Sequence, residues 1–392
     1  MPEDYDRSID ISAPPGRLKF VAMSFSPEPM QRLIGRQSRM VQAVILLALS
    51  VVLIALLEIA GLPAALFLGP MVAGIIVGVN DGHVRVPPNA FMLAQGVVGC
   101  LMVRAMPASV IEEIGRDWPI FVIGIASVIA AANGLGWLLT RWRIMPGTTA
   151  IWGASPGAAG AMVIMAEAYG ADFRLVAFMQ YVRVVCVAIT ASVVSRLWAS
   201  GSGVPPPTPE WFPPIDWLPF AQTVTLAFGG AILGKLLRVP AGSMLLPMLI
   251  GVPLQNLGII SIELPQWFMA ISYALVGWSI GLRFTRPILK HAAKAFPQVL
   301  ASTMALILIC GLFGVLLVVF AGIDPLTAYL ATSPGGADAV AIIASFSNVD
   351  VPFVVAMQTA RFLVVMITGP SLARLIVRWA GVRDEAPQPG TP

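Results

Sequence analysis

The sequence predicts an all-α, polytopic membrane protein made of two homologous halves, and three observations carry this prediction. Hydrophobic residues make up 57% of the 392 residues and charged residues only 11%, whereas about a quarter of the residues of a soluble domain are charged. Apolar segments of about 20 residues, long enough to cross a bilayer, recur along the chain. A motif that begins at Ser155 recurs at Ser333, 178 residues later.

The apolar segments form two series with a proline-rich linker between them. The first series is expected at 41–60, 63–79, 90–104, 118–140, 148–167 and 173–198. The second series is expected at 218–237, 240–259, 267–283, 296–321, 325–346 and 352–379. The domains are therefore a cytoplasmic N-terminal tail at 1–40, membrane repeat 1 at 41–199, a linker at 200–217, membrane repeat 2 at 218–380 and a C-terminal tail at 381–392.

An internal duplication relates the two series. Residues 155–190 and 333–368, aligned without gaps, are identical at 15 of 36 positions. Such self-similarity at a fixed offset indicates a repeated structural unit. Two pairs outside this stretch align as well: Pro70 with Pro247, and Gly99 with Gly277.

Loop charge indicates how the halves are oriented, because cytoplasmic loops carry an excess of Lys and Arg. The N-terminal tail and the loop at 283–294 are both basic. The tail and this loop are both cytoplasmic if the Ser-Pro-Gly segment of each half does not cross the membrane but enters and leaves it on the same side. Each half then has five spans plus one re-entrant or broken segment, ten spans in all, and the second half is inverted. The alternative is twelve spans in parallel halves. We expect a multi-pass protein of the bacterial inner membrane with a cytoplasmic N-terminus.

The repeated motif places helix-breaking residues inside an apolar segment. Its two copies read Ser155-Pro156-Gly157-Ala158-Ala159 and Ser333-Pro334-Gly335-Gly336-Ala337. Irregular backbone at membrane depth is tolerated only where protein buries it or where it lines a cavity. We expect both serines to be helix N-caps and both prolines to lie in first helical turns, so that free N–H groups face a ligand. The plainer interpretation is a tight loop with no further role.

Each motif is followed at the same distance by a glutamine and an arginine. These are Gln180 and Arg183 in the first copy, and Gln358 and Arg361 in the second. A guanidinium binds a carboxylate through two hydrogen bonds, so one or both arginines are candidates to hold an anionic substrate. The structural alternative is a pairing with Asp172, Asp350 or helix-end carbonyls, or a side chain that extends to the membrane interface.

A carboxylate breaks the symmetry between the two copies. Asp338 lies five residues after Ser333, whereas its counterpart in the first copy is Gly160. At membrane depth this carboxylate is a candidate site for a coupling ion, H⁺ or Na⁺. The alternative is that it neutralises Arg361 or Arg183.

Metal and enzyme chemistry find little support in the sequence. The three cysteines, Cys100, Cys186 and Cys310, lie in apolar segments without metal-binding spacing. The two histidines, His83 and His291, fall in expected cytoplasmic loops and are interpreted as solvated. Motifs of metalloproteases, P-loops, α/β-hydrolases and dinucleotide-binding folds are absent from the sequence. We expect no enzymatic activity, no cofactor, no metal and no nucleic acid partner.

The duplicated Ser-Pro-Gly motif and the twin Gln-x-x-Arg helices resemble the AbrB-duplication membrane family, over about residues 41–380. Proteins of this family are also labelled ammonia monooxygenases or AbrB-type regulators. The resemblance implies an inverted-repeat fold and a link to gene regulation or ammonia oxidation. The second copy matches the motif fully, whereas Ala158 stands in the first copy where Gly336 stands in the second.

These observations predict a secondary transporter for a small anionic solute, working by alternating access between inverted halves. The two motifs and their arginines would hold the anion near the bilayer midplane, and Asp338 would couple a cation. We expect a homodimer. The alternatives are a membrane sensor or regulatory protein that influences gene expression and, with less support, an ammonia monooxygenase-like enzyme.

Overall fold

The computed structural model describes residues 34–62, 64–108, 112, 115–142, 144–145, 148–155, 162–163, 166–167, 169–202, 211–239 and 241–380. This part of the chain contains fourteen helices and no strand. Six of these helices are long and apolar enough to cross a membrane, or seven if one bent pair is counted as a single span. The protein is therefore an all-helical, multi-pass membrane protein.

The helices fall into two series on either side of the linker. The first comprises α2 (Arg39–Ile59), α3 (Ala65–Val79), α4 (Pro88–Arg104), α6 (Trp118–Arg141), α7 (Thr149–Ala154) and α9 (Phe173–Ser202). The second comprises α10 (Trp217–Leu236), α11 (Gly242–Asn256), α12 (Gln266–Gly281), α13 (Arg286–Ala292), α14 (Phe296–Ala321), α15 (Pro325–Thr332), α16 (Ala337–Ser345) and α17 (Val351–Ala380).

The helix bounds recur between the two series at the offset seen in the sequence. The starts of α2 and α10, of α6 and α14, and of α9 and α17 all differ by 178 residues, and those of α3 and α11 differ by 177. The expected broken segment at 325–346 is also found, as the two short helices α15 and α16. These bounds are what two copies of one unit would give. Their inverted orientation in the membrane stays a prediction.

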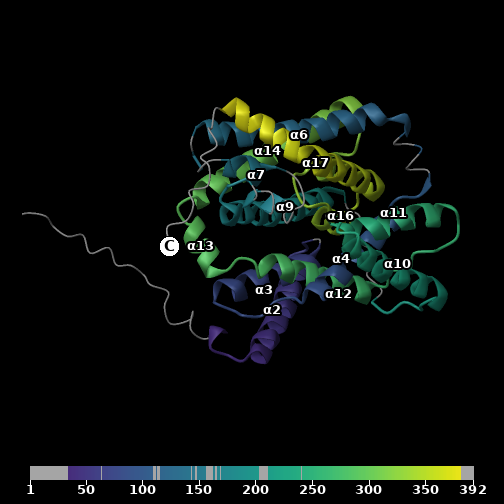
Figure 1. Ribbon diagram of the computed structural model, residues 1–392. Coiled ribbons are helices and arrows are strands. Elements are labelled where there is room, and N and C mark those ends of the chain that lie inside the picture. Colours follow the sequence, from purple (N-terminus) through teal and green to yellow (C-terminus); the bar gives the residue numbers. More distant parts are fainter. Residues whose placement is uncertain are drawn as a thin grey trace, which may run out of the picture.

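The helices pack in two layers, each built from both series (Figure 1). One layer, which we call the panel, contains α2, α3, α4, α10, α11 and α12. The other, which we call the core bundle, contains α6, α7, α9, α14, α15, α16 and α17. Within the panel, helices of one series pack on helices of the other: α3 packs on α12, and α11 packs on α4.

The crossings within the panel bring backbones into direct contact at glycines. A Cβ atom added at Gly277 of α12 would lie 2.7 Å from the carbonyl oxygen of Phe67 in α3. One added at Gly99 of α4 would lie 2.5 Å from the carbonyl oxygen of Met244 in α11. Small residues allow such close packing of membrane helices, where van der Waals contact drives association. The aligned pair Gly99 and Gly277 therefore marks two equivalent helix crossings.

Replacing Gly277 with alanine is expected to destabilise the protein by about 1–3 kcal/mol, because the added methyl group would push α12 away from the α3 backbone. Thermal unfolding of the purified protein in detergent measures this effect. Gly311 of α14 is the matched control, since a Cβ there meets no atom within 4 Å. Alanine at Gly311 should be neutral or slightly stabilising, and equal melting temperatures for the two variants would contradict the close crossing.

Several panel helices are shorter than a bilayer is thick. Helices α3 and α11 have 15 residues each, and at 1.5 Å per residue such a helix is only about 23 Å long. A bilayer core is about 30 Å thick. The expected spans at 63–79 and 240–259 thus form helices at the predicted places, but the total of ten spans stays a prediction.

Candidate functional site

The second copy of the repeated motif lies in the break between α15 and α16. Helix α15 ends at Thr332, and Ser333 is its C-cap with φ −57° and ψ 136°. This extended conformation is the one that Pro334 favours in the residue before it, because the proline ring clashes with a helical neighbour. The prediction that Ser333 is an N-cap is therefore wrong. Gly336 is the N-cap of α16, and Pro334 lies between the helices rather than in a first turn.

The first copy resembles the second at the end of the helix that precedes the motif. Helix α7 ends at Ala154, and Ser155 is its C-cap with φ −59° and ψ 125°. Pro156 and Gly157 lie outside the described residues. The N-cap role of Ser155 and the place of Pro156 in a first helical turn therefore stay predictions.

The glutamine and arginine of the second copy hold the end of α15. Gln358 Nε2 donates to the carbonyl oxygens of Leu330 at 2.8 Å and Ser333 at 3.2 Å. Arg361 Nη1 donates to the carbonyl oxygen of Ser333 at 2.6 Å, and its Nη2 donates to that of Gly335 at 2.9 Å. Arg361 Nη2 also donates to Gln358 Oε1. The pair thus satisfies carbonyl groups that a helix end leaves without partners.

The first copy repeats this arrangement on α7. Gln180 Nε2 donates to the carbonyl oxygens of Trp152 at 2.9 Å and Ser155 at 3.1 Å. Arg183 Nη1 donates to those of Ala154 at 3.2 Å and Ser155 at 3.0 Å, and its Nη2 donates to Gln180 Oε1 at 2.6 Å. Both Gln-x-x-Arg sequences therefore form the same structure at two helix ends.

This geometry decides between some of the roles that the sequence left open for the arginines. Helix-end carbonyls are confirmed as partners of Arg183 and Arg361. Asp172 and Asp350 are not partners, because they accept backbone N–H groups in the first turns of α9 and α17. Extension to the membrane interface is also ruled out, since each arginine is only 3% exposed.

The two arginines remain incompletely paired. The Nε atom of each is buried and has no hydrogen-bond partner in the described part of the chain. The ion pairs formed among the described residues do not include Arg183 or Arg361. The centre of the core bundle therefore holds two buried positive charges, each with one free N–H donor, and an anion there would offset their cost.

Asp338 lies in the first turn of α16 and faces the panel. Its Oδ1 accepts the backbone N–H of Ala339 at 2.9 Å, and its Oδ2 accepts a hydrogen bond from Gln95 Nε2 of α4 at 3.1 Å. Asp338 is half-buried and pairs with neither arginine. The alternative that it neutralises Arg361 or Arg183 by direct contact is therefore wrong.

Gln95 is a site residue that the sequence reasoning missed. A signal for it exists, because Gln95 aligns with Tyr273 at the 178-residue offset, just as Asp338 aligns with Gly160. At both positions of this hydrogen bond, the two copies of the repeat thus carry different types of residue. A search for polar residues that replace apolar ones or glycine in one copy only would have found the pair.

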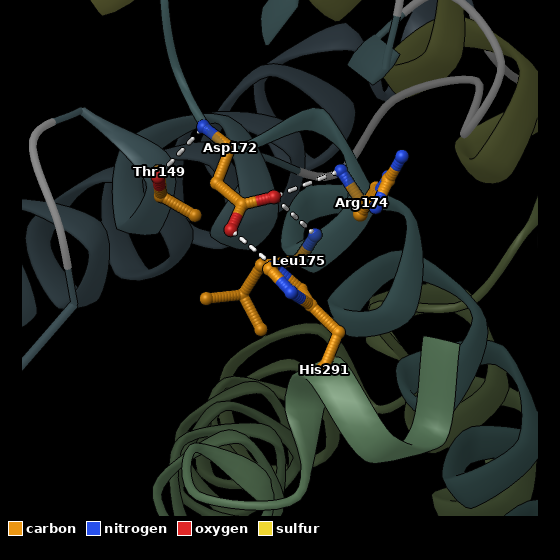
Figure 2. A network of polar contacts seen from close by, with 5 residues as sticks. All are labelled: Thr149, Asp172, Arg174, Leu175 and His291. Atoms are coloured by element: carbon orange, nitrogen blue, oxygen red, sulfur yellow. Dashed lines mark hydrogen bonds and ion pairs between the residues drawn. The ribbon is translucent and has the colours of Figure 1, made fainter. Parts of the chain in front are cut away.

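His291 joins the short helix α13 to the core bundle (Figure 2). Its Nε2 lies 2.6 Å from Asp172 Oδ2, and the Asp172 backbone N–H donates to Thr149 Oγ1 at 3.2 Å. The side chain of His291 is 43% exposed, as expected of a solvated histidine, but His291 lies in helix α13 rather than in a loop. This network fixes the start of α9 to the end of the bent pair α12–α13.

The described residues contain no group of three or more His, Cys, Asp or Glu side chains arranged to hold a metal. Cys100 and Cys310 are buried free thiols, and Cys186 is a half-buried one. The expectations that the protein is not an enzyme and needs neither metal nor cofactor stay predictions.

Comparisons with known proteins agree on one family. The family model described as "Transition state regulatory protein AbrB" matches residues 66–377. The chain is 44% identical over 325 residues to the "Putative regulator AbrB" of Escherichia coli strain K12, which covers 82% of this chain and 93% of that protein. It is 23% identical over 317 residues to the "Uncharacterized protein YhjN" of Bacillus subtilis strain 168, covering 75% of this chain and 80% of that protein. No solved structure gives a significant match.

Proposed function

This chain belongs to the AbrB family, and we propose that it is an integral membrane secondary transporter of a small anionic solute. The family assignment confirms the resemblance noted in the sequence. The printed name of the Escherichia coli relative speaks of regulation, and that of the Bacillus subtilis relative gives no activity. The proposal therefore rests on the site and not on a name.

The observation that carries the proposal is the pair of buried arginines at the two helix breaks. A buried charge without a counter-charge is costly, and removing one partner of a buried pair costs about 3–5 kcal/mol. Arg183 and Arg361 have no carboxylate partner among the described residues, and each keeps an unpartnered Nε. An anionic solute at this place supplies the missing charge and accepts the free N–H groups.

The two-layer packing supports transport by alternating access. In this proposal the panel is the fixed scaffold, and the core bundle carries the anion from one side of the membrane to the other. The two halves are inverted repeats of five spans each, with the broken segments meeting near the bilayer midplane. The protein is a homodimer in the bacterial inner membrane, with its N-terminus in the cytoplasm. It is not an enzyme and needs no cofactor.

Asp338 is proposed as the site of the coupling ion, H⁺ or Na⁺. Its carboxylate lies on the core bundle and is hydrogen-bonded across to Gln95 on the panel. A cation or proton that binds this carboxylate alters a contact between the two layers. Coupling by this route links ion binding to the movement of the core bundle against the panel.

Flux in liposomes tests the transporter and the role of Asp338 together. We expect the purified protein to take up chloride, phosphate or a short carboxylate in a saturable way that depends on a pH or Na⁺ gradient. The Asp338→Asn variant should lose the gradient dependence, because the amide binds neither ion as a carboxylate does. Asp117→Asn is the matched control, since Asp117 forms only an exposed pair with Arg116.

The possible outcomes separate the alternatives. Gradient-dependent flux that persists in Asp338→Asn would remove Asp338 from coupling but leave the transporter in place. Binding of an anion without any flux would point to the sensor alternative. An absence of both binding and flux for every anion in the series would overturn the proposed function.

A further inference from the structure

A small crevice lies beside Arg183, between α6, α7, α9 and α14. Its walls include the hydroxyl side chains of Ser302 and Thr303 on α14, together with apolar residues such as Leu306 and Ala154. The crevice has room for about one water molecule or a particle of similar size. A cationic side chain and two hydroxyl groups thus converge on a space that is otherwise apolar.

The arginine that lines this crevice has a donor to spare. Arg183 uses Nη1 and Nη2 to hold the end of α7 and Gln180. Its Nε is buried and has no partner within the described residues. The ion pairs among the described residues do not include this buried arginine, and an anion in the crevice that it lines would offset the cost of its charge. Ser302 and Thr303 are themselves only 8% and 6% exposed.

The second half of the repeat offers a natural comparison. At the 178-residue offset Ser302 and Thr303 of α14 align with Gly124 and Ile125 of α6. The space beside Gly124 is filled by Met357, whose Cε lies 2.6 Å from where a Cβ would stand. The positions equivalent to Ser302 and Thr303 therefore carry no hydroxyl group, and Met357 packs against the first of them.

We propose that the crevice beside Arg183 binds a small inorganic anion of about the size of chloride, held by the positive charge of Arg183 and by the hydroxyl groups of Ser302 and Thr303. The inference rests on the proposed function in one respect, namely that Arg183 holds an anion. It names the class of that anion, and it places the site at the first arginine with hydroxyl groups contributed by the other half of the repeat.

The size and chemistry of the crevice select the ligand. A space for about one water molecule excludes a carboxylate with a carbon chain or a phosphate. Its polar groups are N–H and O–H donors, which fit a monatomic anion without directional demands. Ser302 Oγ donates to the Val299 carbonyl oxygen at 2.9 Å. This is a weak local bond that the hydroxyl group can exchange for a charged acceptor, since hydrogen bonds to charged groups are stronger.

Thermal unfolding in chloride and in gluconate at the same ionic strength tests the site, because a ligand that binds the native state raises its apparent stability. We expect chloride to raise the melting temperature of the purified protein above its value in gluconate, and bromide to raise it by a smaller amount. Radiolabelled chloride binding gives the affinity directly. The double variant Ser302→Ala with Thr303→Val should bind chloride at least about tenfold more weakly than the unmodified protein, because it has lost two donors to a charged ligand.

The control is Ser272→Ala on the panel, where Ser272 is also buried and also donates to a carbonyl oxygen of its own helix, that of Phe268. This variant should keep the full chloride effect. Equal melting temperatures of the unmodified protein in chloride and gluconate would overturn the inference, as would an unchanged chloride affinity in a folded double variant. Chloride binding without flux would uphold this site and contradict the proposed transporter. Flux of a carboxylate that chloride neither inhibits nor competes with would uphold the transporter and contradict the chloride site.

Discussion

Replacing Arg361 with methionine is expected to abolish anion flux and to lower the free energy of unfolding by about 3 kcal/mol or more. The change removes the donors to the carbonyl oxygens of Ser333 and Gly335 and the partner of Gln358 Oε1. Gly335 O and Gln358 Oε1 would then be buried without these hydrogen bonds, while Ser333 O would keep only the one from Gln358 Nε2. Thermal unfolding in detergent and uptake into liposomes measure the two effects.

Two further variants make the Arg361 result interpretable. Arg174→Met is the matched control, because Arg174 is exposed at the start of α9, and it should keep both stability and flux. Arg361→Lys keeps the charge but lacks the planar fork that reaches two carbonyl groups at once. It should fold, with lower stability, and show strongly reduced flux. A stable Arg361→Met protein with unchanged flux would remove this arginine from both the structural and the transport role.

The membrane fold was largely readable from the sequence, because hydrophobic length and repeat offset are one-dimensional properties. The expected segments at 118–140 and 296–321 correspond to helices at Trp118–Arg141 and Phe296–Ala321. The division into panel and core bundle was not readable. It depends on contacts such as that of α3 with α12, which join residues about 200 positions apart. Neither apolar length nor loop charge carries information about such pairs.

The structure brings the glutamine and arginine of each motif to a helix end, but the local geometry of the second motif differs from the prediction. The sequence placed serines, glutamines and arginines of the two motifs in one structure, and the hydrogen bonds of Gln358 and Arg361 to the end of α15 agree with that. The difference concerns Ser333, which ends α15 and does not start α16. The rule that a residue before proline avoids the helical region was available and favours this outcome. The preference of serine for N-caps was given too much weight.

The departures from symmetry carry more functional information than the symmetry itself. The repeated Gln-x-x-Arg sequences build the same helix-end structure twice, so their recurrence is explained by folding. The polar residues present in one copy only have no such explanation. Asp338 stands against Gly160, and Ser302 stands against Gly124. Ser302 lines the crevice beside Arg183, and Asp338 lies at the boundary between the core bundle and the panel.

Replacing Gln358 with leucine is expected to destabilise the protein by about 3 kcal/mol, although the side chains are similar in size. The amide of Gln358 donates to the carbonyl oxygens of Leu330 and Ser333, and its Oε1 accepts from Arg361. Leucine removes these three buried hydrogen bonds. Each group keeps one other partner, because Leu330 O still accepts from the Ser333 hydroxyl group, Ser333 O from Arg361 Nη1, and Arg361 Nη2 still donates to Gly335 O. The measurement is the melting temperature of the purified protein in detergent.

The control for this change is Gln37→Leu, because Gln37 is exposed just before α2. It should leave the melting temperature nearly unchanged. Gln180→Leu, at the equivalent place in the first copy, should destabilise as strongly as Gln358→Leu, since Gln180 makes the same bonds to the end of α7. A Gln358→Leu protein as stable as Gln37→Leu would show that the break between α15 and α16 holds without the amide. The helix-end role assigned to both Gln-x-x-Arg sequences would then have to rest on the arginines alone.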